Sequence, residues 1–95
     1  MNKLNKRRDS VYSDKDNWHN CTLNNIPDEI QYDLICKWCE LRCESAWTVS
    51  TTWLNDQGKP FNAMPYDTRF PDESAFYFEH HYDYALFKLQ WIDYL

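Results

Sequence analysis

Residues 25–54 have the sequence NIPDEIQYDLICKWCELRCESAWTVSTTWL, in which a helical pattern directly precedes a strand pattern. Pro27, the acidic residues Asp28 and Glu29, and Asn25 as a candidate cap are typical of a helix start. At 100° per residue, five charged side chains fall in one stripe about 80° wide. They are Glu29, Asp33, Lys37, Glu40 and Glu44. Most other positions are apolar or aromatic, so we expect a helix over residues 27–45 that other structure largely covers.

Residues 46–54 (AWTVSTTWL) are rich in β-branched and aromatic side chains. Trp47, Val49, Thr51 and Trp53 alternate with smaller hydroxyl residues, which predicts a strand with one buried face. The following residues 55–58 (NDQG) have the composition of a turn.

Further short elements flank this pair. We expect a strand or extended lead-in over 18–23, a second main strand over 74–79 (SAFYFE), a turn over 80–83 and a second helix over 83–92. The alternation of Phe87, Leu89 and Trp91 also fits a strand. The expected fold class is α+β, a small antiparallel sheet of two to four short strands packed against two helices. Five aromatic residues are expected to be largely buried between the layers, namely Trp38, Trp47, Trp53, Phe78 and Phe87.

The composition indicates a binding domain. The chain has 95 residues, enough for one domain, with 17 aromatic residues (5 Trp, 7 Tyr and 5 Phe) and a single glycine, Gly58. Tyr and Trp suit both small cores and protein-binding surfaces. One glycine cannot build the Gly-rich phosphate loops of nucleotide-using enzymes, and no nucleophile with a matched base is identifiable, so we predict no enzymatic activity.

Charge divides the chain into two parts. Residues 1–17 are polar, with four basic residues in the first eight, and are expected to form a tail or arm before a single domain over 18–95. The residues after the first eight carry 6 basic and 15 acidic side chains. This acidic body disfavours direct nucleic-acid binding. No apolar stretch is long enough for a membrane span, and no signal peptide is recognisable, so we expect reduced cysteines and no membrane.

The cysteines allow a zinc hypothesis that helix geometry weakens. On one helix, Cys36 and Cys43 lie about 10.5 Å apart along the axis, so at most two of Cys36, Cys39 and Cys43 can share a metal. We expect buried free thiols and no metal or other cofactor. His80 and His81 are adjacent and would not converge on one substrate, so a contact at the sheet's end is expected for one of them.

The C-terminal run from Phe76 to Trp91, FYFEHHYDYALFKLQW, resembles the endings of small, uncharacterised tailed-bacteriophage accessory proteins. These have an aromatic strand, an acidic turn and a D-A-x-x-F-x-L-x-W-like helix. The segment around Trp38, Cys39 and Glu40 also looks like such chains. Tyr84 departs from the pattern because it separates Asp83 from Ala85. The resemblance implies a phage origin, and hence the host cytoplasm, without assigning any functional residue.

A binding site is expected in the loop over 59–72, which contains three prolines and hot-spot residue types. The candidate residues are Phe61, Met64, Tyr66, Asp67, Arg69, Phe70, Asp72, Glu73 and Glu79. Capping of the core by Phe61 and Phe70 is the competing interpretation.

The leading functional hypothesis is a non-enzymatic phage protein that inhibits a host protein, or a protein–nucleic-acid complex, by steric blocking. The expected target is a nucleic-acid-directed defence system of the anti-CRISPR or anti-restriction type, reached through an acidic and aromatic surface. A virion structural or assembly protein and a zinc- or thiol-dependent regulator are the alternatives. A monomer or small homo-oligomer is expected.

Overall fold

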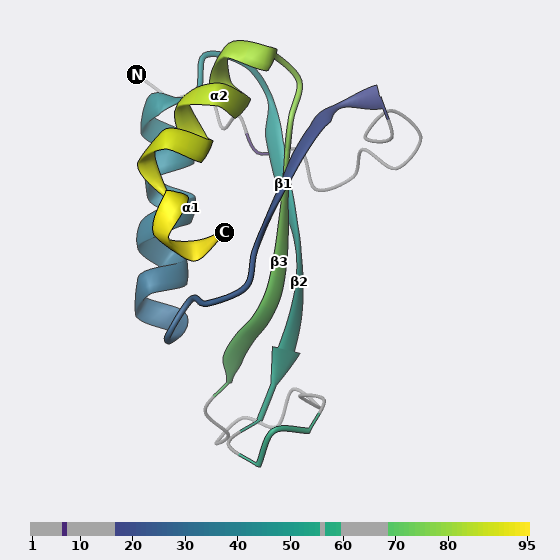
Figure 1. The fold of residues 1–95 in the computed structure, drawn as a ribbon, viewed down its shortest axis with the longest axis vertical. Coiled ribbons are helices and arrows are strands. Elements are labelled where there is room, and N and C mark those ends of the chain that lie inside the picture. Colours follow the sequence, from purple (N-terminus) through teal and green to yellow (C-terminus); the bar gives the residue numbers. More distant parts are fainter. Residues whose placement is uncertain (1–6, 8–16, 56, 60–68) are drawn as a thin grey trace, which may run out of the picture.

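The computed structural model describes Arg7 and residues 17–55, 57–59 and 69–95. These residues form two layers (Figure 1), a three-stranded antiparallel sheet and two helices that lie together on one of its faces. The strand order is β1-β3-β2, so the last strand in sequence lies in the centre. The expected α+β class is therefore confirmed.

Helix α1 spans Glu29–Arg42 and is shorter than the predicted 27–45. The cap is Asp28 and not Asn25, because the Asp28 carboxylate accepts a hydrogen bond of 2.8 Å from the backbone N–H of Gln31. Pro27 precedes this cap and lies outside the helix. At the other end, the N–H of Cys43 closes the last turn on the carbonyl of Cys39.

The sheet consists of β1 (His19–Leu23), β2 (Trp47–Leu54) and β3 (Phe70–Phe78). The first two agree with the predicted segments, whereas β3 begins four residues before the predicted 74–79. A β-bulge explains the difference, because Asp72 is the extra residue between the pairs Thr52–Glu73 and Trp53–Pro71.

Pro71 is tolerated in this central strand for a local reason. Strand β1 pairs with β3 only from Ser74 to Phe78, so Pro71 lies where β3 has β2 as its only strand neighbour among the described residues. A proline that lacks an N–H donor is acceptable at such an edge position. The sequence around residues 61–64 also fits a short edge strand, and that segment lies outside the described residues.

The C-terminal segment is helical. Helix α2 spans His81–Gln90, two residues earlier than predicted, and a 3₁₀ turn follows over Ile92–Tyr94. The strand alternative for this segment is wrong. The chain end returns to the sheet, because the carbonyl of Tyr94 accepts a 3.0 Å hydrogen bond from the N–H of Asn24 just after β1.

The core lies between the sheet and the helices. Its buried apolar residues are Cys21, Leu23, Ile26, Tyr32, Ile35, Cys39, Cys43, Trp47, Phe76, Phe78 and Phe87. Burial is thus confirmed for three of the five aromatic residues predicted to be largely buried. The prediction is wrong for Trp38 and Trp53, which pack against the core but are only partly buried. Phe87 lies at the centre, with ring centroids of Phe76 and Phe78 at 4.7 Å and 4.8 Å.

A buried carboxylate joins the two layers at the start of α2. Asp83 is almost fully buried and accepts hydrogen bonds from the backbone N–H groups of Glu44 and Ser45, with the Ser45 hydroxyl at 2.7 Å. Two successive N–H groups that follow a helix form a natural anion site. Asp83 therefore fixes the connection between α1 and β2.

Two smaller features complete the described structure. The turn expected at 55–58 is confirmed for its described residues, since Gly58 adopts a positive φ of 75° and the Asn55 side chain accepts hydrogen bonds from the N–H groups of Gln57 and Lys59. Arg7 forms a parallel bridge with Trp47 on β2, and its guanidinium lies 5.5 Å from the Trp47 ring centroid.

Candidate functional site: an exposed apolar helical face

Helix α1 turns an apolar stripe toward solvent. Ile30, Leu34 and Leu41 project within about 40° of one another at 100° per residue. All three are exposed. The prediction that other structure largely covers this helix is therefore wrong for the described part of the chain.

The reason lies in which side of α1 meets the sheet. Tyr32, Ile35 and Cys39 are the buried residues of the helix, on the side opposite the Ile30 stripe. A helix on a two-layer domain buries one face only, and no further described element lies outside α1. The apolar residues that face away from the sheet thus remain in contact with water.

Helix α2 also exposes large apolar side chains. Tyr82 and Leu89 are exposed there, and a groove of about 510 Å³ joins the two helices. The groove is lined by Trp38, Arg42, Glu44, Tyr82, Leu86, Leu89 and Gln90. We call Ile30, Leu34, Leu41, Tyr82 and Leu89 with this groove the helical face; each of the five residues is between 52% and 74% exposed.

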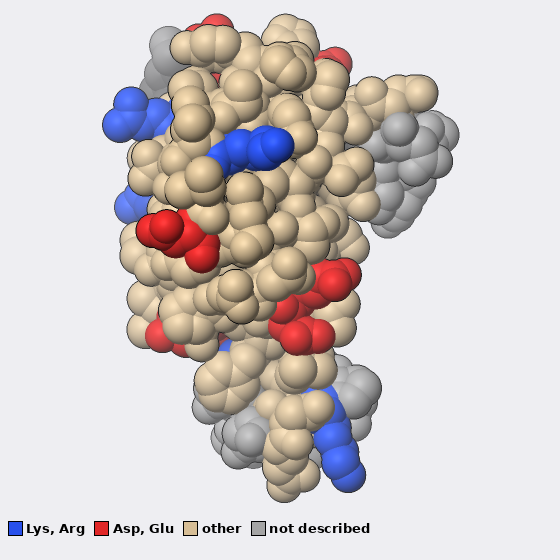
Figure 2. Space-filling view, in the orientation of Figure 1, with Lys and Arg blue, Asp and Glu red and all other residues tan. Residues whose placement is uncertain are grey.

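Charged groups lie at the border of the helical face and also in its groove, where Arg42 and Glu44 are part of the lining. Asp33 and Lys37 are exposed and lie next to the stripe of Ile30, Leu34 and Leu41 on the surface of α1. Figure 2 shows charged side chains as separate patches, with uncharged atoms over most of the area between them. An apolar centre with a polar rim is the usual composition of a protein-binding surface.

The predicted loop site is only partly within the described residues. Phe61, Met64, Tyr66 and Asp67 lie outside them. Arg69 and Phe70 are half-buried at the start of β3. The predicted acidic residues do not form one patch, because the exposed Asp72 and Glu73 lie about 20 Å along the strand from the exposed Glu79.

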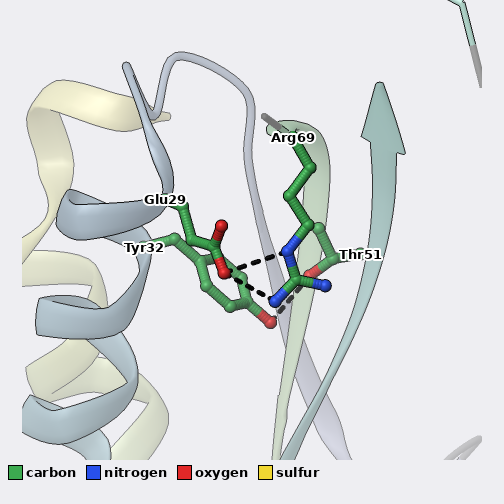
Figure 3. A network of polar contacts seen from close by, with 4 residues as sticks. All are labelled: Glu29, Tyr32, Thr51 and Arg69. Atoms are coloured by element: carbon green, nitrogen blue, oxygen red, sulfur yellow. Dashed lines mark hydrogen bonds and ion pairs between the residues drawn. The ribbon is translucent and has the colours of Figure 1, made fainter. Parts of the chain in front are cut away.

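Arg69 has a structural role at the base of that loop (Figure 3). Its guanidinium contacts one carboxylate oxygen of Glu29 through Nε at 2.9 Å and through a terminal nitrogen at 2.6 Å. It also lies 4.0 Å from the ring centroid of Trp53. The hydrogen bond to Glu29 raises the pKa of Arg69, although burial acts in the opposite direction. These contacts hold the start of β3 and the end of β2 against the first turn of α1.

Tyr32 extends the same network into the core. The Thr51 hydroxyl donates a 3.0 Å hydrogen bond to the Tyr32 hydroxyl oxygen, and the Tyr32 ring meets Trp53 edge-on at 4.7 Å. Burial raises the pKa of Tyr32 to about 12. The phenol therefore stays protonated at neutral pH and acts as a packing and hydrogen-bonding group.

The cysteines are free thiols, and Cys21, Cys39 and Cys43 are buried in the core as expected. Burial raises the pKa of Cys21, and it raises that of Cys39 well above its usual value. No cluster of three or more His, Cys, Asp or Glu side chains among the described residues is arranged to hold a metal ion.

The adjacent histidines are both exposed, and His81 makes a ring contact at the end of the sheet. The His81 ring lies 5.1 Å from that of His19, the first residue of β1, and 5.8 Å from Tyr84. This confirms the contact expected for one histidine. Asp83 bonds the α1–β2 connection, so its carboxylate is engaged away from any acid–base arrangement with these rings.

Comparison of the chain with protein-family models, with curated proteins and with solved structures finds no match. Neither described helix is long and apolar enough to cross a membrane.

The sequence contained a signal for the helical face that its interpretation missed. Ile30, Leu34 and Leu41 lie beside the charged stripe of the helix and not opposite it. In a helix that is apolar almost all round, periodicity does not decide which apolar side faces the core. Contact with the sheet decides that.

Proposed function

We propose that this chain is a non-enzymatic protein-binding domain whose helical face is its main contact surface. The observation that carries the proposal is the exposure of Ile30, Leu34 and Leu41 on α1 and of Tyr82 and Leu89 on α2, the two helices that line the groove. Large apolar side chains exposed together on neighbouring helices often mark surfaces that a protein partner covers.

The composition of the helical face supports a protein partner. Trp38, Tyr82 and Arg42 line the groove and belong to the residue types that dominate binding energy at interfaces. Leu86 and Leu89 of α2 also line the groove. An amphipathic segment of a partner would place apolar side chains in it and meet the charged groups at its border.

The biological role we propose is inhibition of a host protein by steric blocking, with the chain encoded by a phage. A host nuclease or defence complex with a basic surface is the proposed target class, because the acidic body of the chain favours such an encounter. An interface of about 800 Å² per partner suffices to block a site.

A double substitution, Leu41→Gln with Leu89→Gln, tests the contact surface. The chain and this variant would be immobilised side by side and exposed to extracts of candidate bacterial hosts, and captured proteins quantified by mass spectrometry. We expect at least one stoichiometric partner that the variant loses. The melting temperature of the variant should stay near that of the unchanged chain because both leucines are exposed.

The matched control is Asn20→Gln, an exposed position on the sheet, which should leave capture unchanged. The biological readout is the plating efficiency of a restricted or CRISPR-targeted phage on cells that express each form. Rescue by the unchanged chain and by Asn20→Gln, but not by the leucine variant, supports inhibition. Equal capture and equal rescue by all three forms would refute the helical face as the contact surface.

A further inference from the structure

Within the part of the chain that the structure describes, the outer edge of β2 lacks most of the features that usually protect an edge strand. Strand β2 is an edge of the sheet, eight residues long, and contains no charged residue and no proline. Proteins usually protect such edges with short strands, lysines, prolines or covering elements. The opposite edge, β1, follows this rule because it has only five residues.

The described residues pair with this edge at one position only. The bridge from Arg7 reaches Trp47 at the beginning of the strand, and no other described residue pairs on the outer side of Val49 to Trp53. The bridge shows that the edge accepts extended backbone. Five residues of strongly strand-forming sequence remain beyond it.

We propose that a second copy of this chain occupies that edge, with β2 pairing antiparallel to β2 of the partner around a two-fold axis at Thr51. The two three-stranded sheets then become one sheet of six strands. An isologous contact of this type closes at two copies, and it leaves Trp47 of each chain to its bridge with Arg7.

The side chains around Thr51 are self-complementary in this register. Val49 of each copy lies opposite Trp53 of the other copy, on the side of the sheet that carries the helices. Both residues are hydrophobic, and both are only partly buried in the single chain. Aromatic and β-branched residues are favourable cross-strand partners. Ser50 lies opposite Thr52 of the other copy on the open side of the sheet, where both are exposed.

Charge does not oppose this contact locally, although each chain carries a net charge of −5. Residues 47–54 are uncharged, and the carboxylates elsewhere are screened over about 8 Å at physiological ionic strength. We therefore expect the association to strengthen as salt is raised. The same two-fold axis places the helical layers of both copies on one side of the sheet, so the dimer presents two helical faces to partners.

Sedimentation of the full chain over a wide concentration range tests the proposal. The mass should rise from the chain mass of 11.6 kDa toward twice that value and no further. In parallel, amide hydrogen exchange at residues 49–53 should slow as concentration increases. A constant monomer mass with unchanged exchange would overturn the proposal, and so would growth to larger oligomers.

Two matched variants test the register. Ser50→Lys with Thr52→Lys places like charges opposite each other at both cross-strand positions and should abolish dimer formation. Ser50→Lys with Thr52→Glu places opposite charges there and should preserve it. Circular dichroism and the melting temperature verify that both variants fold.

Equal association by the two variants would overturn the register around Thr51. The Leu41→Gln and Leu89→Gln variant should still dimerise, so failure of the edge contact and failure of the helical face are distinguishable.

Discussion

Removal of the Asp83 carboxylate should destabilise the domain more than its position in a polar turn suggests. Asp83→Ala deprives the N–H groups of Glu44 and Ser45 and the Ser45 hydroxyl of their acceptor. Hydrogen bonds to charged groups contribute about 1.5–3 kcal/mol, but Glu44 is exposed and Ser45 half-buried, so water replaces part of the loss. We therefore expect a loss of about 2–4 kcal/mol.

That loss is a large part of the roughly 5–15 kcal/mol typical of a domain and corresponds to a melting temperature lower by about 10–30 °C. Asp83→Asn keeps one acceptor oxygen and should cost less, about 1–2 kcal/mol. Urea denaturation measures both changes in the free energy of unfolding, provided that the m-values of the variants are equal. The control is Asp93→Asn, which alters an exposed carboxylate. If Asp83→Ala were as stable as this control, the proposed joining role of Asp83 would be wrong.

Three other substitutions or modifications test the packing. Ser74→Ala should leave stability unchanged or raise it by up to about 1 kcal/mol, because the buried Ser74 hydroxyl has no hydrogen-bond partner among the described residues; a clear loss in urea denaturation would contradict this. The folded-state pKa of Tyr32, about 12, exceeds the value of about 10 for an unfolded chain, so its contribution is complete below pH 10 and is lost as pH rises through 12. Tyr32→Phe should flatten that pH dependence in thermal melts, and an unchanged profile would argue against burial of the phenol. Iodoacetamide should label the half-buried Cys36 before Cys21 and Cys39, whose thiol pKa values burial raises; equal rates by peptide mass spectrometry would argue against this order.

Much of the fold was predictable because it depends on local patterns. Alternation over residues 46–54 and the acidic start before Ile30 identified a strand and a helix to within three residues at each end. The bulge at Asp72 was not predictable, because a proline at position 71 usually argues against a strand. Only the limited length of β1 makes that proline acceptable.

The candidate site was less predictable than the fold. Sequence reasoning placed binding in the loop over 59–72. Of its described residues, Lys59 belongs to the turn after β2, and Arg69 to Asp72 belong mainly to the structural contacts at the base of the loop. The helical face emerged only from the packing of α1, and the roles of Phe61, Met64, Tyr66 and Asp67 stay predictions.

The sequence by itself determined the α+β class, the positions of the helices and two of the strands, and the burial of three cysteines, because these depend on periodicity and side-chain type. The tertiary structure decided which side of α1 meets the sheet, which carboxylate is buried and which strand lies in the centre of the sheet. These outcomes arise from contacts between residues far apart in the chain, such as Asp83 with Ser45, 38 positions away. A helix that is apolar on nearly every side offers several faces of similar hydrophobicity, and the shape of the sheet selects which of them is buried.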